Sequence, residues 1–177
     1  MKKILSVLVR NQPGVLMRVA GMFSRRGFNI DSLAVGMTQN RRFSRMTVTV
    51  DNDDATVGQI IKQLEKLVEV EDVRLLPEEN KMSRGLAMIK VSAGANRMDI
   101  LKLGEVFRAH VIDIDDDVVI FQITGVERKI KAFVDIMVPY GILEMVQTGV
   151  VALERGDKCM QFGETSKCNW PEDDENM

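Results

Sequence analysis

The apolar residues of this chain change their spacing in the same order twice. Residues 3–10 have a strand pattern, and apolar residues then recur at helical spacing as far as Arg26. Two strand patterns, a second helical pattern and a short strand pattern complete the first series, and the same order returns after residue 83. Such a series usually forms a four-stranded antiparallel sheet with both helices on one face. The sequence therefore predicts an α+β protein made of two tandem ferredoxin-like βαββαβ domains.

The two halves differ in detail but predict the same set of elements. In the first half, strand patterns cover residues 3–10, 28–37, 46–50 and 70–76, and the helical faces consist of Leu16, Val19, Ala20 and Phe23 and of Val57, Ile60, Ile61, Leu64 and Leu67. In the second half, strand patterns cover residues 86–91, 111–114, 118–124 and 142–152, and the helical faces consist of Ile100, Leu103 and Phe107, after a cap at Asn96, and of Ile130, Phe133, Val134 and Met137. We therefore expect a first domain at residues 1–77, a polar linker at 78–83, a second domain at 84–159 and a disordered acidic tail at 160–177.

The composition is that of a soluble protein that binds neither nucleic acid nor membranes. The formal net charge is −2, and no segment is basic enough to indicate nucleic-acid binding by itself. No apolar run approaches the roughly 18 residues that a membrane span requires, and the chain opens with no leader segment. Cys159 and Cys168 match no common zinc or redox motif, so we expect two free thiols, with a disulfide as the alternative. These features predict a cytoplasmic protein.

The loop before the first helix is the candidate ligand site. The first N–H groups of a helix have no internal partners and carry partial positive charge, so they suit a carboxylate. Gly14 would let a ligand approach the backbone, and the Asn11 amide could meet the carboxylate or the ammonium group of an amino acid. The ligand's side chain would then contact Val15, Leu16 or Ile30. From the residues alone, however, an Asn11 that simply caps the helix beside an incidental Gly14 is the favoured alternative.

Other residue groups do not predict a metal or catalytic site. Asp113 and the run 115–117 carry oxygen ligands that a hard cation prefers, but their spacing matches no calcium loop, and a solvated turn is favoured. His110 has no nucleophile or metal-ligand pattern around it, so we expect a structural role. An RNA-binding domain of the same strand order would stack bases on exposed aromatics, and residues 4–8 and 44–48 contain none. No acid, base or nucleophile converges as an independent enzyme would require.

Several motifs resemble those of one family. The pattern Asn11-x-x-Gly14-x-Leu16, followed by residues 23–32 and 44–47, is similar to the amino-terminal ACT domain of the acetolactate synthase small regulatory subunit. Ile112-Asp113, Ala132-Phe133 and residues 148–156 resemble the carboxy-terminal domain of that family. The likeness extends over residues 1 to about 160, in order and nearly without gaps.

The resemblance implies a regulatory subunit that activates a separate catalytic subunit and confers feedback inhibition by valine or another branched-chain amino acid. It implies a homodimer of ACT domains placed side by side, with the effector bound between two chains. Asn11, Gly14, Val15 and Leu16 would come from one chain, and Asn29 and Ile30 from the other. Without the resemblance, Asn29 would be interpreted as a turn residue after Gly27. A stand-alone amino-acid sensor for another partner remains the alternative.

The same resemblance sets expectations for cofactors and for the second domain. This chain would bind no cofactor, whereas the catalytic partner would hold thiamine diphosphate and magnesium, with FAD left open. The second domain would serve partner activation, since residues 92–97 lack the Asn-x-x-Gly spacing of the ligand loop. Gly36 departs from the family, in which alanine is frequent near the effector pocket, so the shape of the pocket is left open.

Overall fold

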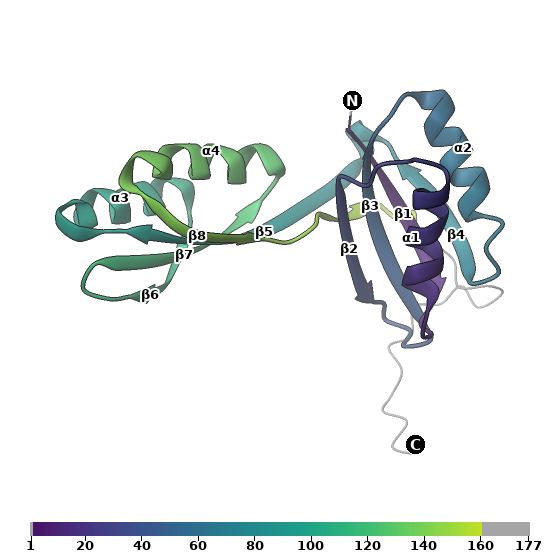
Figure 1. Cartoon of the computed structure of the whole chain (residues 1–177), viewed down its shortest axis with the longest axis horizontal. Coiled ribbons are helices and arrows are strands. Elements are labelled where there is room, and N and C mark those ends of the chain that lie inside the picture. The colour runs from purple at the N-terminus through teal and green to yellow at the C-terminus, as the bar shows by residue number, and fades with distance from the viewer. Residues whose placement is uncertain (1, 161–177) are drawn as a thin grey trace, which may run out of the picture. The chain divides into compact units, whose positions relative to one another are not determined.

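The computed structural model describes residues 2–160, and its first sheet has the topology expected from the sequence (Figure 1). Its strands pair in the order β2-β3-β1-β4, and all neighbours are antiparallel. The elements of this domain are β1 (Lys2–Arg10), α1 (Val15–Arg25), β2 (Ser32–Met37), β3 (Phe43–Asp51), α2 (Asp54–Leu64) and β4 (Val70–Leu76). This order and pairing are those of a ferredoxin-like domain.

Alternation along the central strands builds the core of the first domain. Successive strand residues point to opposite faces of the sheet, so Leu5, Val7 and Val9 of β1 meet the helices together with Met46 and Val48 of β3. Residues of α1 and α2 complete this core: Val15, Val19, Met22, Phe23, Val57, Ile60 and Leu64. The predicted face of α2 is confirmed at these positions.

Two expectations for the segment 15–31 are wrong. The buried face of α1 consists of Val15, Val19, Met22 and Phe23, so the prediction is confirmed at Val19 and Phe23. It is wrong at Leu16, which is 46% exposed, because Val15 and Leu16 both satisfy helical spacing. The second strand begins at Ser32 instead of Phe28. The Phe28 ring packs edge-on against Phe23, with ring centroids 6.4 Å apart. This contact fixes Phe28 against the end of α1, so the residues before Ser32 connect helix to strand and are not part of β2.

The second domain repeats the topology in the order β6-β7-β5-β8, and β9 pairs with β5 outside that path. The elements that follow β4 are the 3₁₀ turn Glu78–Asn80, β5 (Lys81–Ser92), the 3₁₀ turn Gly94–Asn96, α3 (Arg97–Phe107), β6 (His110–Ile114), β7 (Val118–Gly125), α4 (Glu127–Met137), the 3₁₀ turn Val138–Tyr140, β8 (Ile142–Gln147) and β9 (Val151–Glu154). The core of the second domain contains Ile89, Ile100, Phe121, Ile130 and Phe133. No helix within residues 2–160 has the length and apolar character needed to cross a bilayer.

Three local expectations in this half need correction. The linker predicted at 78–83 is a 3₁₀ turn followed by the first residues of β5. The single strand predicted at 142–152 is divided into β8 and β9. The Thr148 N–H donates to the Leu86 carbonyl, but the Leu86 N–H donates to the Thr148 hydroxyl, which replaces the backbone carbonyl that a regular ladder would use. Asn96 lies at the N-cap position of α3, but its side chain makes no capping hydrogen bond.

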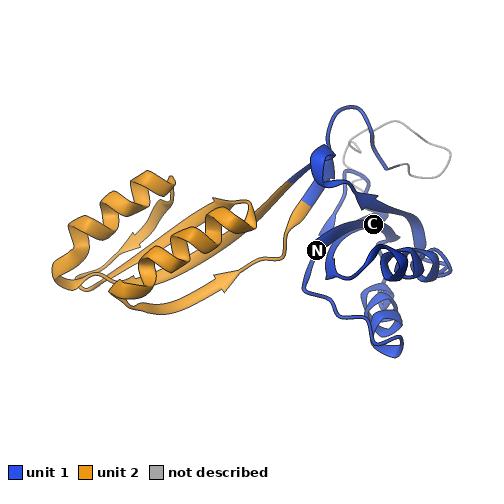
Figure 2. Cartoon of the chain, turned by 90° about the horizontal axis from the view of Figure 1, so that it is seen from above, with its two compact units in different colours: residues 1–82, 152–177 blue, residues 83–151 orange. Residues whose placement is uncertain are grey.

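The chain returns to the first domain after β8. The second compact unit spans residues 83–151, and the described residues after 151 group with residues 2–82 (Figure 2). Residues 152–160, the C-terminal strap, reach the face of the first sheet that is turned away from α1 and α2. There the Ser6 hydroxyl donates to Met160 Sδ at 3.1 Å, and Met160 packs on Leu8. The domain boundary expected at residue 159 therefore lies at residue 151.

This correction has a simple physical cause. A ferredoxin-like domain covers only one face of its sheet with helices, so Leu8 of β1 needs another partner. Met160 supplies it, and both side chains are nearly inaccessible to solvent, at 5% for Met160 and 0% for Leu8. The disordered tail predicted at 160–177 starts one residue too early, because Met160 is buried. Residues 161–177, including Cys168, lie outside the described residues. Cys159 lies in the strap as an exposed free thiol.

Candidate functional site

The loop between β1 and α1 is held by the neighbouring hairpin. The Asn11 N–H donates to the Arg42 carbonyl at 2.7 Å, and Asn11 Nδ2 donates to the Arg41 carbonyl at 3.0 Å. Asn11 therefore does not cap α1, and the alternative that was favoured from residue chemistry alone is wrong. The capping position is Gly14, which has φ 84° and makes no side-chain bond. Its left-handed conformation is one that glycine adopts without strain.

The first turn of α1 offers unpaired donors. The Val15 N–H is 3.4 Å from the Gln12 carbonyl, and the Arg18 N–H donates to the Gly14 carbonyl. Within residues 2–160, no acceptor is found for the N–H groups of Leu16 and Met17. These two groups lie at the positive end of the helix dipole, where an anion is stabilised.

The expected site residues differ in how they could contact a ligand. Asn11, Gly14 and Leu16 are exposed, whereas Val15 is 3% exposed and packs into the core. Val15 can therefore offer a ligand its backbone but not its side chain. Ile30 is half-buried against the core, and Asn29 is exposed with its Nδ2 donating to Asp31 Oδ1 at 2.7 Å.

One chain does not bring the two halves of this site together. Asn11 and Gly14 precede α1, whereas Asn29 and Ile30 follow it. The helix has 11 residues, and a rise of about 1.5 Å per residue separates its ends by roughly 16 Å. A single amino acid cannot span that distance, so a ligand that contacts all of these residues needs a second copy of the chain.

An apolar edge lies beside this loop, and the sequence did not single it out. β2 is at the edge of the first sheet, where its backbone can pair with another strand. Val35 and Met37 of β2 are 45% and 73% exposed, and Leu16 and Met17 of α1 are 46% and 78% exposed. The alternation of residues 33–37 was visible in the sequence, but it indicated a strand without indicating that half of it would be exposed. A Cβ atom added at Gly36 would have no neighbouring atom within 4 Å.

The corresponding loop of the second domain is built differently. A 3₁₀ turn precedes α3, and the Ala93 N–H donates to the Asp117 carbonyl. Arg97 of the first helical turn donates to the carbonyls of Asp115 and Asp116. The predicted turn at residues 115–117 is confirmed, and Arg97 ties it to the helix start. Within the described part of the chain, no group of three or more His, Cys, Asp or Glu side chains is placed to hold a metal.

Known proteins share both domains of this chain. Residues 5–72 match a family model described as the AHAS small subunit-like ACT domain, and residues 84–156 match one described as the small subunit of acetolactate synthase. A probable acetolactate synthase small subunit of Archaeoglobus fulgidus is 48% identical over 159 residues, which are 89% of this chain and 99% of that protein. The chain belongs to the acetolactate synthase small-subunit family.

Other family members agree with this assignment. The acetolactate synthase small subunit of Mycolicibacterium smegmatis is 46% identical over 155 residues, covering 87% of this chain and 91% of that protein. The crystal structure of the acetolactate synthase small subunit from Thermotoga maritima has a TM-score of 0.85 and 39% identity, covering 89% of this chain and 99% of that one. The tandem ferredoxin-like fold is thereby confirmed. Its small-subunit identity and its ACT domain support a role as a regulatory subunit.

Proposed function

We propose that this chain confers feedback inhibition by valine or another branched-chain amino acid on acetolactate synthase and activates its catalytic subunit. The observation that carries the proposal is the first turn of α1, where the N–H groups of Leu16 and Met17 face an exposed loop that begins at Asn11. An amino-acid carboxylate suits these donors, and Asn11 offers an amide for the ligand's polar groups.

The site is completed by a second copy of the chain. The length of α1 keeps Asn29 and Ile30 away from the loop of their own chain. The exposed apolar side chains of α1 and β2, beside an open strand edge, favour a homodimer in which two ACT domains lie side by side. In that dimer, Asn11, Gly14, Val15 and Leu16 of one chain would contact the ligand together with Asn29 and Ile30 of the other.

Regulation follows from where the ligand binds. A ligand shared by two chains adds contacts only in an arrangement that brings both halves of the site together, so it selects that arrangement. The shift is limited by the difference in the ligand's affinity for the two arrangements. The catalytic subunit, in the cytoplasm, would respond through the second domain, and it would supply thiamine diphosphate and magnesium, with FAD left open. This chain would bind no cofactor.

Calorimetric titration tests the effector directly. The full chain is titrated with valine, leucine, isoleucine and lysine, and we expect saturable heat with the branched-chain ligands only. Asn11→Ala should weaken valine binding about tenfold to a hundredfold, because a buried polar group of the ligand loses its partner. Gly14→Asp should weaken it further, because a carboxylate would lie beside the ligand's own and the positive φ would be strained.

A matched variant separates ligand contact from loop position. Asn11 also holds the hairpin through the Arg41 carbonyl, so its loss could move the loop. Asn40→Ala removes a hairpin bond, from the Arg42 N–H to Asn40 Oδ1, without changing a proposed ligand contact. Equal weakening by both variants, or no heat with any branched-chain ligand, would overturn the proposed site. The same variants in the reconstituted complex, assayed for acetolactate formation with and without valine, test inhibition itself.

A further inference from the structure

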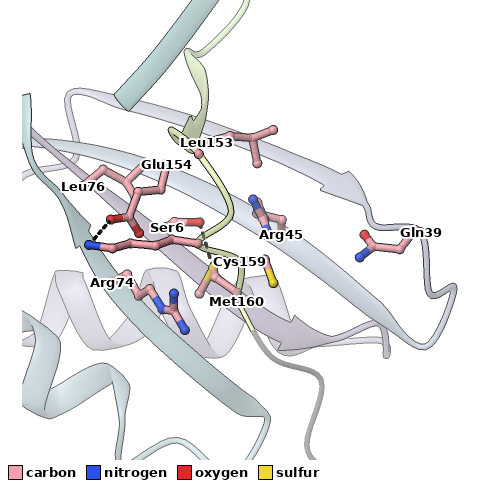
Figure 3. A pocket seen from close by; sticks show the side chains of 11 residues that line it. Ser6, Gln39, Arg45, Arg74, Leu76, Leu153, Glu154, Cys159 and Met160 are labelled. Atoms are coloured by element: carbon pink, nitrogen blue, oxygen red, sulfur yellow. Dashed lines mark hydrogen bonds and ion pairs between the residues drawn. The ribbon is translucent and has the colours of Figure 1, made fainter. Parts of the chain in front are cut away.

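A cavity lies between the first sheet and the C-terminal strap. Its volume is about 280 Å³, and it is lined by side chains of β1, β3 and β4 on one side and by residues 153–160 on the other. Figure 3 shows Arg45 and Arg74 on the sheet, with Glu154, Cys159 and Met160 on the strap. No residue of the loop between β1 and α1, the α1 loop, is among the described residues that line this cavity.

Strand register places both arginines on the same face. Arg74 of β4 lies opposite Ser6, and Arg45 of β3 lies opposite Leu8. Ser6 and Leu8 are two residues apart on β1, so they point to the side of the sheet that lacks helices. The two guanidinium groups therefore flank the central strand β1 beneath the strap.

Cationic side chains outnumber carboxylates among the described residues that line the cavity. Arg45, Arg74 and Lys158 are cationic, and Glu154 is the only carboxylate in that described part of the lining. Glu154 is engaged from two sides, by Asn80 Nδ2 at 3.3 Å and by Lys158 Nζ at 3.5 Å. The Arg74 Nε–H donates to Asp72 Oδ2 at 2.9 Å. The terminal nitrogens of its guanidinium carry further N–H donors that a ligand can use.

We propose that this cavity binds a small oxyanion, a phosphoryl or carboxylate group, between Arg45, Arg74 and Lys158. The planar fork of arginine matches both groups through paired hydrogen bonds. The volume lies near the lower end of the roughly 300–1,000 Å³ of small-molecule sites, so the ligand is small. Because the arginines belong to the sheet and Lys158 belongs to the strap, a bound anion fastens the strap to the first domain.

Thermal unfolding of the full chain tests the site with inorganic phosphate and with acetate, at an ionic strength kept constant with sodium chloride. We expect a saturable rise of the melting temperature with at least one of them, since a ligand that binds the folded state stabilises it. A rise with phosphate alone assigns a phosphoryl ligand, and a rise with acetate alone assigns a carboxylate. No saturable rise with either anion overturns the proposal.

Substitutions locate the effect. Arg45→Gln and Arg74→Gln should each lower the affinity for the anion by about tenfold or more, because each removes charged hydrogen bonds to it. The Lys158 side chain is 65% exposed, so Lys158→Gln should leave the fold undisturbed and lower the affinity for the anion several-fold. Arg128→Gln, on the exposed surface of α4, is the matched control and should have no effect. Unchanged affinity in the sheet and strap variants also overturns the proposal.

The proposed effector site and the proposed oxyanion site can be refuted independently. Asn11→Ala should leave the phosphate or acetate titration unchanged, because Asn11 does not line the cavity. Loss of valine binding with an intact oxyanion response therefore concerns the α1 loop only. A lost oxyanion response with intact valine binding concerns the strap cavity only.

Discussion

The two domains share one strand order but differ at the start of the first helix. In the first domain, Gly14 adopts a left-handed conformation, and the donors of Leu16 and Met17 face solvent. In the second, a 3₁₀ turn leads into α3, and Arg97 occupies the helix start with its bonds to the turn at residues 115–117. The difference teaches that one topology can carry two different loops at this position, and only the loop of the first domain suits the effector that we propose.

The faces of the two sheets that lack helices also differ. In the first domain, Ser6 and Thr47 are 1% and 3% exposed on that face, which carries the strap. In the second, Met88 and Val146 lie on the equivalent face and are 38% and 62% exposed. The first sheet thus packs on both sides within residues 2–160, while the second packs on one.

The largest predicted effect concerns these faces. Met160→Ala should lower the free energy of unfolding of the first domain by about 2–3 kcal/mol, because a buried side chain leaves a cavity above Leu8. Met88→Ala, on the exposed face, should change the stability of the second domain by less than about 1 kcal/mol. Native-state hydrogen exchange at the amides of Leu5 and Ile89 reports the two domains separately. A Met160→Ala protein with unchanged protection at Leu5 would show that the strap contributes nothing to the first domain.

Periodicity explains why most elements could be predicted. The strand β3 and the helix α2 present single unambiguous apolar faces, such as Met46, Val48 and Val50. The face of α1 was misplaced because Val15 and Leu16 begin two overlapping stripes, and local spacing does not choose between them. Tertiary packing decides, and it buries Val15.

Contacts that are distant in sequence could not be predicted. Met160 is one apolar residue without a periodic neighbour, and its partner Ser6 lies 154 positions earlier. Asn11 has the composition of a helix cap, but its amide is taken by the Arg41 carbonyl of a hairpin 30 residues away. The loop before α1 was recognisable as a motif, but the hydrogen bonds that position it depend on the assembled sheet.

A smaller effect distinguishes the helices. A methyl group on Gly104 of α3 would lie 2.5 Å from the Phe121 ring, which is fully buried, whereas Gly58 of α2 has open space around it. Gly104→Ala should therefore destabilise its domain by about 1–2 kcal/mol, since overpacking exceeds the gain in helix propensity. Gly58→Ala should stabilise its domain by about 0.5–1 kcal/mol. Urea unfolding of both variants measures the signs, and a stabilising Gly104→Ala would contradict this packing.

The smallest effect concerns the second helix of each domain. α2 begins after Asp53, whose carboxylate accepts from the Thr56 N–H at 2.7 Å, whereas α4 begins after Val126, which makes no side-chain cap. Val126 is exposed and has an extended backbone, as a capping residue requires. Val126→Asp should therefore stabilise the second domain by about 1 kcal/mol near neutral pH.

The pH dependence identifies the cause of this stabilisation. The backbone hydrogen bond from Thr56 holds the pKa of Asp53 below its ordinary value of 3.8. A carboxylate with a lowered folded-state pKa stabilises the protein above its unfolded pKa, and this contribution is lost as the pH falls through the folded value. Asp53→Asn should remove that acid-sensitive contribution from the first domain, and Val126→Asp should add one to the second. If urea midpoints show that the gain from Val126→Asp persists at pH 2, burial or propensity and not a charged cap is responsible.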